Sequence, residues 1–299
     1  MTNWAARLVG LLALMAPATA YAAAGQPTAW GFGFQEAASP TMERIVSFHN
    51  LLMYLITAIT LFVTGLIAFV AVRFNRRANP TPSRTTHNTL IEVLWTAVPV
   101  LILVLIAIPS FKLLYFADRV ENPELTIKAV GRQWYWHYEI PEQEYKGQKI
   151  GGFQFDSYLL EGADLKPGDL RQLSVDNPLG LPVGAKVQVL VTAGDVLHNF
   201  AMPSLGLKLD AVPGRLNETW TLINENFAGT TFYGQCSELC GARHAYMPIQ
   251  IDAMDDAGFL AWAAKAKREY EPLDAPTATA PTAGITHLAA VKQEPSRKE

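Results

Sequence analysis

Two long apolar runs dominate the N-terminal part of the chain. Residues 51–72 and 93–111 contain no charged side chain, and each approaches the ~20 residues that a helix needs to cross the ~30 Å hydrocarbon core of a bilayer. Unbroken apolar runs of this length argue against a buried pair of helices in a soluble protein. The pattern therefore predicts transmembrane helices over residues 45–72 and 92–116.

The segment between the two runs is basic. No lysine or acidic residue occurs in it before Glu92, and its charged residues are Arg73, Arg76, Arg77 and Arg84. Because lysine and arginine accumulate in cytoplasmic loops, residues 73–91 are predicted to form a cytoplasmic loop. Both outer ends of the helical hairpin would then lie on the opposite side of the membrane.

The first 24 residues have the organisation of a secretory signal peptide. Arg7 is followed by a short apolar stretch over residues 8–15 and then by small residues that end in three alanines. The apolar stretch is too short to span a bilayer, and no polar face recurs as in an amphipathic helix. We expect residues 1–24 to be removed and residues 25–44 to be a periplasmic segment.

Short alternating segments replace the apolar runs in the second half of the chain. Residues 125–130, 186–192, 218–223 and 230–235 are rich in β-branched and aromatic side chains and are separated by turn residues, which predicts strands. Several short strands without intervening helices favour a β-sandwich or barrel. Residues 256–270 predict a terminal helix with basic side chains in its last turns.

Composition limits the class of partner. The 299 residues are half hydrophobic and carry a net charge of only −3, so no role in nucleic-acid binding is indicated. The soluble domain is expected over residues 117–270. Residues 271–299 are rich in Pro, Thr and Ala without a core pattern, and a disordered tail is predicted there.

One short segment carries most of the metal-binding chemistry. CSELCGARHAYM at residues 236–247 contains the only two cysteines of the chain, together with a histidine and a methionine. Sulfur and imidazole donors are soft and favour copper over the hard cations, which prefer oxygen. A mononuclear blue-copper site needs one cysteine. The second cysteine allows two thiolates to bridge two metal ions.

Two other interpretations of the cysteines were weighed. A disulfide is the common use of two cysteines in an exported domain, but it would explain neither His244 nor Met247, and closing so short a loop adds little stability. Zinc prefers four sulfur or nitrogen ligands, among which methionine is a poor choice. Copper is therefore favoured. A second histidine is available at His198, which follows the strand predicted over residues 186–192.

Five segments together resemble subunit II of the bacterial haem–copper cytochrome c oxidases. They are GRQWYWHY at residues 131–138, DVLH at 195–198, PSLGLK at 203–208, DAVPGR at 210–215 and YGQCSELCGARHAYMP at 233–248. The resemblance extends over residues 33–270, and its cysteine motif is highly specific. It implies an N-terminal transmembrane α-helical hairpin plus an all-β cupredoxin-like Greek-key barrel.

The same resemblance implies a dinuclear copper centre of the CuA type. Cys236 and Cys240 would bridge two copper ions, and His198 and His244 would be the terminal ligands. Met247 would bind one copper weakly, and Glu238 would bind the other through its backbone carbonyl. Glu238 is also a candidate ligand for magnesium at the interface with subunit I. A centre of this kind relays electrons and makes no bonds.

The implied function is electron transfer within an oxidase in the bacterial inner membrane. Electrons from cytochrome c would pass through the copper centre to the haems of subunit I, where oxygen is reduced to water with proton translocation. Further oxidase subunits and membrane lipid would be the other partners. The copper domain and the N-terminus would face the periplasm, and this chain alone would reduce no oxygen.

Two further roles follow from family positions. Trp134 matches the residue that passes electrons from cytochrome c to copper. The segment Trp134-Tyr-Trp136 is expected to lie on a strand, where side chains alternate, so that the two tryptophans share a face. Acidic residues would steer the basic face of cytochrome c. The four chosen by family position are Glu139, Asp156, Asp176 and Asp195, although ordinary solvated charges remain an alternative.

Glu92 matches a glutamate at the cytoplasmic mouth of a proton path into subunit I. Residues 89–92 also fit a helix capping box with Thr89 as the N-cap, which would suffice to explain Glu92. Two rival functions remain open at this point: a membrane-tethered copper chaperone and a quinol oxidase subunit II without copper. A thioredoxin-like αβ pattern would favour the chaperone, and loss of copper-binding side chains would favour the quinol oxidase.

Overall fold

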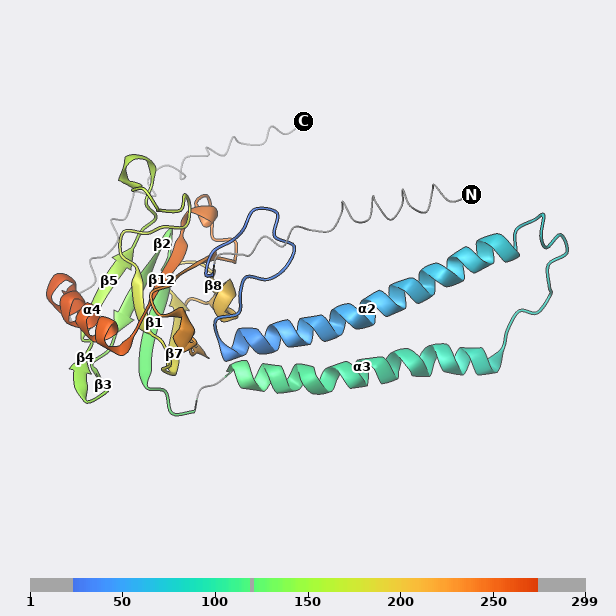
Figure 1. Cartoon of the computed structure of the whole chain (residues 1–299), viewed down its shortest axis with the longest axis horizontal. Coiled ribbons are helices and arrows are strands. Elements are labelled where there is room, and N and C mark those ends of the chain that lie inside the picture. The colour runs from blue at the N-terminus through green and yellow to red at the C-terminus, as the bar shows by residue number, and fades with distance from the viewer. Residues whose placement is uncertain (1–23, 119–120, 274–299) are drawn as a thin grey trace, which may run out of the picture.

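The computed structural model describes residues 24–118 and 121–273 of the chain. The predicted signal peptide, apart from residue 24, lies outside the described residues, as does nearly all of the predicted tail. Figure 1 shows two parts: a long helical hairpin and a compact domain of strands at one end of it.

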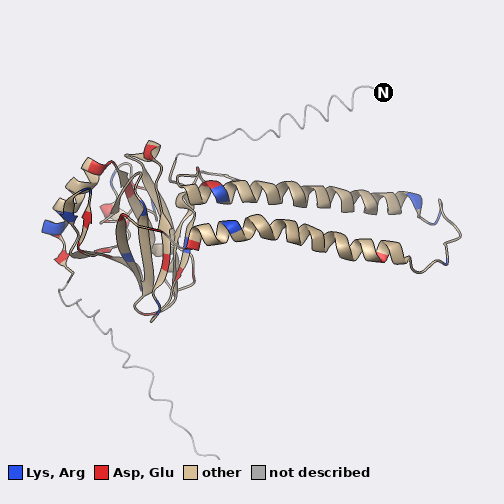
Figure 2. Cartoon of the chain, turned by 90° about the horizontal axis from the view of Figure 1, so that it is seen from below, with Lys and Arg blue, Asp and Glu red and all other residues tan. Residues whose placement is uncertain are grey.

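The hairpin consists of α2 (Pro40–Arg73) and α3 (Thr89–Asp118). Within the described residues these are the two helices that are long and apolar enough to cross a membrane. Their apolar side chains are largely exposed along their length, and Figure 2 shows that their charged residues lie toward the helix ends. Such helices have no partner for their apolar surface in water. The chain is a two-pass membrane protein.

The two helices begin with different caps. Ser39 caps α2, because its side chain accepts a hydrogen bond from the backbone N–H of Met42. At α3 the side chain of Asn88 accepts from the N–H of Ile91. The predicted capping box with Thr89 as N-cap is therefore wrong, since Asn88 caps one residue earlier and Glu92 falls one position too late to complete the box.

Eleven strands of the β domain form two sheets. The six-stranded sheet has the order β10-β7-β1-β2-β5-β13, and the five-stranded sheet has the order β6-β12-β11-β8-β9. The first comprises β1 (Leu125–Arg132), β2 (Tyr135–Ile140), β5 (Phe153–Ser157), β7 (Val187–Ala193), β10 (Asn217–Thr221) and β13 (Glu271–Pro272). The second comprises β6 (Leu179–Pro182), β8 (His198–Met202), β9 (Leu207–Ala211), β11 (Thr231–Cys236) and β12 (Pro248–Met254). A separate hairpin pairs β3 (Gln143–Tyr145) with β4 (Gln148–Ile150).

Both sheets bury alternate residues in one continuous core. In β7, for example, Val187, Val189 and Val191 point inward, as expected for strands with one buried face. Most neighbouring strands are antiparallel; β1–β7 and β12–β6 are parallel pairs. The predicted fold class, a transmembrane helical hairpin with an all-β cupredoxin-like barrel, is confirmed.

The end of the domain agrees with expectation in one respect and differs in another. The predicted terminal helix is present as α4 (Asp256–Glu269), capped by the side chain of Asp255. The predicted tail, in contrast, does not begin at residue 271. Glu271 and Pro272 form β13 and pair with β5, because a free sheet edge beside the helix end accepts two more residues.

Hydrogen bonds attach the hairpin to the β domain at the end of α3 and at the start of α2. The last carbonyl groups of a helix have no partner within it, and here two of them accept from the domain. Trp220 Nε1 donates to the carbonyl of Phe116 at 2.8 Å, and Thr219 Oγ1 donates to that of Ala117 at 3.2 Å. At the start of α2, Ser39 Oγ donates to the carbonyl of Leu205 at 2.7 Å.

Gly206 lets α2 approach the domain closely, and its replacement tests this contact. Its φ is +68°, and a Cβ there would lie 3.1 Å from the backbone of Met42. Gly214 has a similar φ of +76° with nothing within 4 Å. We expect Gly206→Ala to lower the thermal midpoint of the detergent-solubilised chain by several degrees more than Gly214→Ala, because both carry left-handed strain of about 1–2 kcal/mol but only the first also clashes. Equal midpoints would contradict the close contact.

Candidate metal centre

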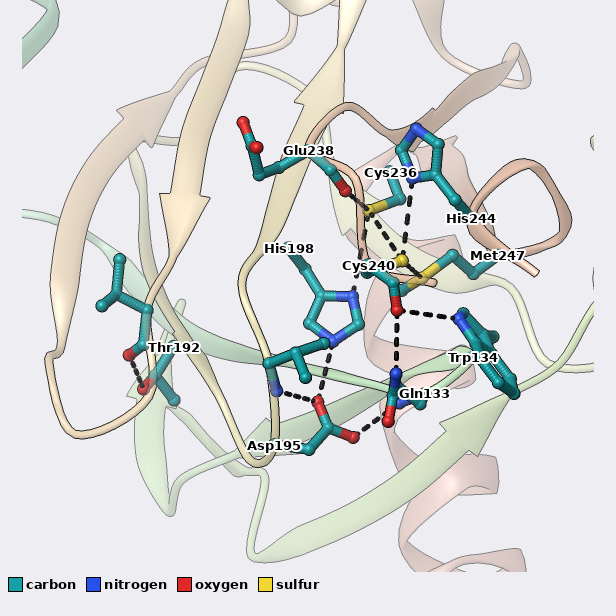
Figure 3. A network of polar contacts seen from close by, with 12 residues as sticks. Gln133, Trp134, Thr192, Asp195, His198, Cys236, Glu238, Cys240, His244 and Met247 are labelled. Carbon is teal, nitrogen blue, oxygen red and sulfur yellow. Dashed lines mark hydrogen bonds and ion pairs between the residues drawn. The ribbon is translucent and has the colours of Figure 1, made fainter. Parts of the chain in front are cut away.

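Sulfur, nitrogen and oxygen donors converge at one end of the two sheets (Figure 3). The two cysteine Sγ atoms lie 3.8 Å apart. Each has an imidazole beside it: His198 Nδ1 is 3.9 Å from Cys236 Sγ, and His244 Nδ1 is 3.7 Å from Cys240 Sγ. Met247 Sδ lies 3.5 Å from Cys240 Sγ, and the carbonyl oxygen of Glu238 lies 3.3 Å from Cys236 Sγ.

Three structural elements supply these groups. Cys236 is the last residue of β11, and His198 is the first residue of β8 beside it. The loop from β11 to β12 carries Cys240 and Met247, with His244 in a short 3₁₀ helix (His244–Tyr246). The structure thus brings the predicted ligand residues together: those in the loop are near in sequence, and His198 arrives through the pairing of β8 with β11.

The sulfur atoms and His198 are closed to solvent, whereas His244 is half-buried and the Glu238 side chain is exposed. His198 is fully buried, and both cysteines are 3% exposed. The cysteines are free, because 3.8 Å between their sulfurs is far longer than the ~2.05 Å of a disulfide bond. Among the described residues, the ligand atoms of His198, Cys236 and Cys240 form a group within 4.8 Å of one another that could hold a metal ion.

The two thiols differ in acidity. Burial opposes ionisation of Cys236, but hydrogen bonding to His198 and to the backbone at Asn199 lowers its pKa to about 6. Burial, together with the charge of the Cys236 thiolate, raises the pKa of Cys240 to about 12. Like charges this close disfavour a second ionisation. Ionisation of Cys236 is therefore favoured and that of Cys240 opposed, and a bound cation would stabilise the second thiolate.

The donor set fits copper. Two cysteine sulfurs, two imidazoles, a thioether and a carbonyl oxygen surround one small volume, and the carboxylate of Glu238 points away from it (Figure 3). Magnesium and calcium would require oxygen ligands. A single tetrahedral zinc ion would leave the thioether and the carbonyl unused. Thiolates adjacent to two imidazoles suit copper, and the paired sulfurs suit two such ions.

Asp195 and Gly131 fix the orientation of His198. Asp195 Oδ1 lies 2.9 Å from His198 Nε2, so that Nδ1 faces Cys236. A carboxylate in this position holds the imidazole in one tautomer and orientation. On the other side, a Cβ at Gly131 would lie 2.8 Å from the ring of His198. Glycine is required at position 131 for this close approach.

The turn between β1 and β2 is bonded to the cysteine loop. Gln133 Nε2 donates to the carbonyl of Cys240 at 2.8 Å, and Trp134 Nε1 donates to the same oxygen at 3.1 Å. The backbone N–H of Gln133 also donates to Asp195 Oδ2 at 2.7 Å. Gly241 adjoins this contact with a φ of +117°, and a Cβ there would lie 3.0 Å from the Trp134 ring. The turn therefore connects the two loops that carry the ligands.

The aromatic run does not lie entirely on a strand. Arg132 pairs directly with Tyr135, so Gln133 and Trp134 form a two-residue turn and β2 begins after them. The prediction that Trp134 alternates along a strand with Trp136 is wrong. Trp134 is half-buried at the turn, whereas Trp136 lies in the core. Trp136 Nε1 donates to the carbonyl of Met247, so the indoles of Trp134 and Trp136 both contact the loop between β11 and β12.

The four predicted docking acids occupy different environments. Asp195 belongs to the centre itself, as described above. Glu139 forms an ion pair with Lys128 at 2.8 Å. Asp156 lies 2.7 Å from the buried His137, and Asp176 accepts from the backbone of Tyr158. Burial raises the pKa of Asp176. Asp156 and Asp176 share a surface hollow of about 270 Å³ with three tyrosines, Tyr135, Tyr158 and Tyr270.

Glu92 lies far from the donors, in the first turn of α3 at the opposite end of the hairpin (Figure 1). Gln133, Gly131 and Gly241 also adjoin the centre, although none of them was predicted as a site residue. Gln133 carries no metal-binding chemistry, so only its place inside the motif at residues 131–138 could have drawn attention to it. The two glycines also lie inside the quoted motifs, but the reason for glycine at these positions is visible only in the close contacts that they permit.

Known families and relatives match most of the chain. The family described as cytochrome C oxidase subunit II, periplasmic domain, matches residues 125–254, and the one described as its transmembrane domain matches residues 27–113. The probable cytochrome c oxidase subunit 2 of Rickettsia conorii is 49% identical over 81% of this chain and 73% of its own length. That of Rickettsia bellii is 47% identical over 86% of this chain and 90% of its own length.

A solved structure is also similar. The periplasmic domain of subunit II of cytochrome oxidase of Bradyrhizobium japonicum is 45% identical, covers 51% of this chain and 99% of its own, and superposes with a TM-score of 0.43.

The hydrogen bond from Gln133 to the cysteine loop should contribute measurably to stability. We expect Gln133→Ala to lower the unfolding free energy of the copper-free soluble domain by about 1 kcal/mol, because one hydrogen bond to the Cys240 carbonyl is lost. Urea denaturation measures the change. Gln148→Ala, on the exposed strand β4, is the control and should have no effect. Equal values for the two variants would show that the turn does not hold the loop.

Proposed function

The chain belongs to the cytochrome c oxidase subunit II family, and on this premise we propose that it is the subunit through which electrons enter a bacterial cytochrome c oxidase. It accepts electrons from cytochrome c at a dinuclear copper centre. It passes them to the haem centres of subunit I, where oxygen is reduced to water with proton translocation. Oxygen chemistry belongs to that partner, and this chain is a relay.

One observation carries this function: two imidazoles, a thioether and a backbone carbonyl converge on two buried cysteine sulfurs. Cys236 and Cys240 would hold the copper ions through their thiolates. The other residues that would bind copper are His198, His244, Met247 and, through its backbone carbonyl, Glu238. When bound, the copper pair would supply a one-electron redox centre.

The protein keeps the donors in place and excludes water. Each donor comes from a strand end or a tied loop, and buried aromatic rings pack behind them: Trp136 lies 5.1 Å from Phe200 and 6.2 Å from His198, centroid to centroid. Because the donor atoms are fixed and water is largely excluded from the sulfurs, their positions should change little between redox states. Such a small rearrangement suits fast electron transfer rather than bond making.

Trp134 provides a path from the surface to the ligands. Its ring is half-buried, and its Nε1 donates to the carbonyl of Cys240, so the indole is joined to a ligand residue by one hydrogen bond. We assign electron entrance to this ring. Cytochrome c would dock around it, steered by Glu139, Asp156, Asp176 and Asp195.

The remaining roles concern the membrane and subunit I. In the proposed orientation residues 73–91 face the cytoplasm, and residues 25–44 and the β domain face the periplasm of a bacterial inner membrane. Glu92 would lie at the entrance of a proton path into subunit I. Glu238, whose carbonyl faces the copper, would offer its carboxylate to magnesium at the subunit I interface. Other oxidase subunits and lipid would cover the hairpin.

The copper assignment predicts different effects for two ligand variants. Cys240→Ser removes a bridging thiolate, so the soluble domain refolded with copper should bind at most one copper and lose its purple mixed-valence spectrum. Met247→Leu removes only a weak ligand and should retain both coppers with a shifted potential. Copper content, electron paramagnetic resonance and a redox titration measure these outcomes. If the wild-type domain binds copper as a colourless Cu(I) protein, a copper chaperone is favoured. If it binds no copper, a quinol oxidase subunit is favoured.

The role of Trp134 predicts a kinetic defect without a structural one. Trp134→Phe keeps an aromatic ring but loses the N–H donor to Cys240. We expect electron transfer from reduced cytochrome c to slow at least about tenfold, equivalent to a barrier higher by about 1.4 kcal/mol, with the copper spectrum unchanged. Stopped-flow reduction measures the rate. Trp262→Phe is the control, because Trp262 packs between α4 and Phe153. A normal rate of reduction in Trp134→Phe would show that Trp134 is not on the electron path.

A further inference from the structure

A groove lies between the two helices where they meet the β domain. Its volume is about 390 Å³, and its lining includes Arg44, Phe48 and Leu51 of α2. These residues are spaced to lie on one face of that helix. Pro109, Lys112 and Leu113 of α3 face them across the groove and are likewise spaced to share a helix face. The groove therefore combines two cations with an apolar wall.

The two cations have no acidic partner in the described part of the chain. Arg44 and Lys112 are exposed, and neither forms an ion pair with a described residue. The Arg44 guanidinium lies over the ring of Phe116, 3.5 Å from its centroid, which holds it beside α3. The neighbouring acid, Glu43, is bonded instead to Asn224 of the domain.

The membrane orientation does not account for these cations. Lysine and arginine are expected on the cytoplasmic side, where the arginines of residues 73–91 lie. Figure 2 shows basic residues also at the domain-side ends of both helices, which face the opposite side in the proposed orientation. Two unpaired cations at this end call for an anionic ligand.

The position of the groove along the membrane normal suits a phospholipid, whose headgroup and acyl chains lie at different levels. Arg44 is near the start of α2, which begins at Pro40, at the level expected for headgroup phosphates. Leu51 follows seven residues later, roughly 10 Å farther along the helix, where the uncharged run over residues 51–72 begins. The cations thus lie at the polar boundary, and the apolar wall extends into the hydrocarbon.

We propose that this groove binds one anionic phospholipid, with its phosphate between Arg44 and Lys112 and an acyl chain along Phe48, Leu51 and Leu113. The assignment to the outer leaflet rests on the orientation given under the proposed function. A lipid is favoured over an acidic protein segment because the lining changes from charged to apolar along the membrane normal. An extended protein segment would need polar backbone partners, which the apolar wall does not offer.

Native mass spectrometry of the intact oxidase tests the site. The complex is reconstituted in nanodiscs of phosphatidylcholine with a minor fraction of phosphatidylglycerol, released, and its bound lipids are counted. We expect wild type to retain one phosphatidylglycerol that Arg44→Gln/Lys112→Gln retains about tenfold less, because two phosphate contacts are lost. The charge-conserving Arg44→Lys/Lys112→Arg should retain it. Arg76→Gln/Arg77→Gln, which removes two cations from the opposite leaflet, should behave as wild type.

Three outcomes would overturn the lipid site. The neutral variant could retain as much phosphatidylglycerol as wild type, or phosphatidylcholine could be retained equally well. Loss of subunit I from the neutral variant with unchanged lipid would show that the cations pair with that subunit. The copper spectrum and the rate of reduction by cytochrome c are recorded on the same samples. If the copper spectrum and the reduction rate are normal and the neutral variant still retains the lipid, the lipid site is wrong and the electron-transfer function is unaffected.

Discussion

The hydrogen bonds that meet at the backbone carbonyl of Cys240 hold the metal-binding end of the domain together. Gln133 and Trp134 both donate to this oxygen from the turn between β1 and β2, more than a hundred positions earlier in the chain. The same turn donates to Asp195, which orients His198. One two-residue turn therefore fixes a cysteine, a histidine and an aromatic ring relative to one another. Preorganised donors of this kind are what a site needs if its geometry is to survive a change of charge.

Features that depend on neighbouring residues could be predicted from the sequence. The apolar runs, the alternation within strands and the crowding of sulfur and imidazole over residues 236–247 are visible along the chain, and the structure has the corresponding helices, strands and convergent loop. His198 could be connected to that loop only through the motif resemblance. Its approach depends on the pairing of β8 with β11, which no local pattern specifies.

Features that depend on register or on a single cap could not be predicted in the same way. The turn at Gln133 and Trp134 contains neither glycine nor proline, so nothing in its composition separates it from the strands on either side. Thr89 and Asn88 are both suitable N-caps, and the choice between them depends on where the helix begins. Glu139 and Asp156 were predicted as docking acids, with solvated charges as the alternative. Strand pairing gives each a partner that the sequence did not indicate: Lys128 on β1 and His137 on β2.

The attachment of the hairpin also determines where the metal centre lies. β8 begins at His198 and ends at Met202, and the 3₁₀ turn after it, Pro203–Leu205, accepts the capping hydroxyl of Ser39 at the start of α2. A proposed copper ligand and the attachment of the membrane hairpin therefore occupy the two ends of one strand, whose four residue steps span roughly 13 Å. The strand acts as a spacer of constant length between bilayer and centre. Electron tunnelling weakens steeply with distance, so this fixed height sets how far each electron must travel to reach an acceptor within the membrane.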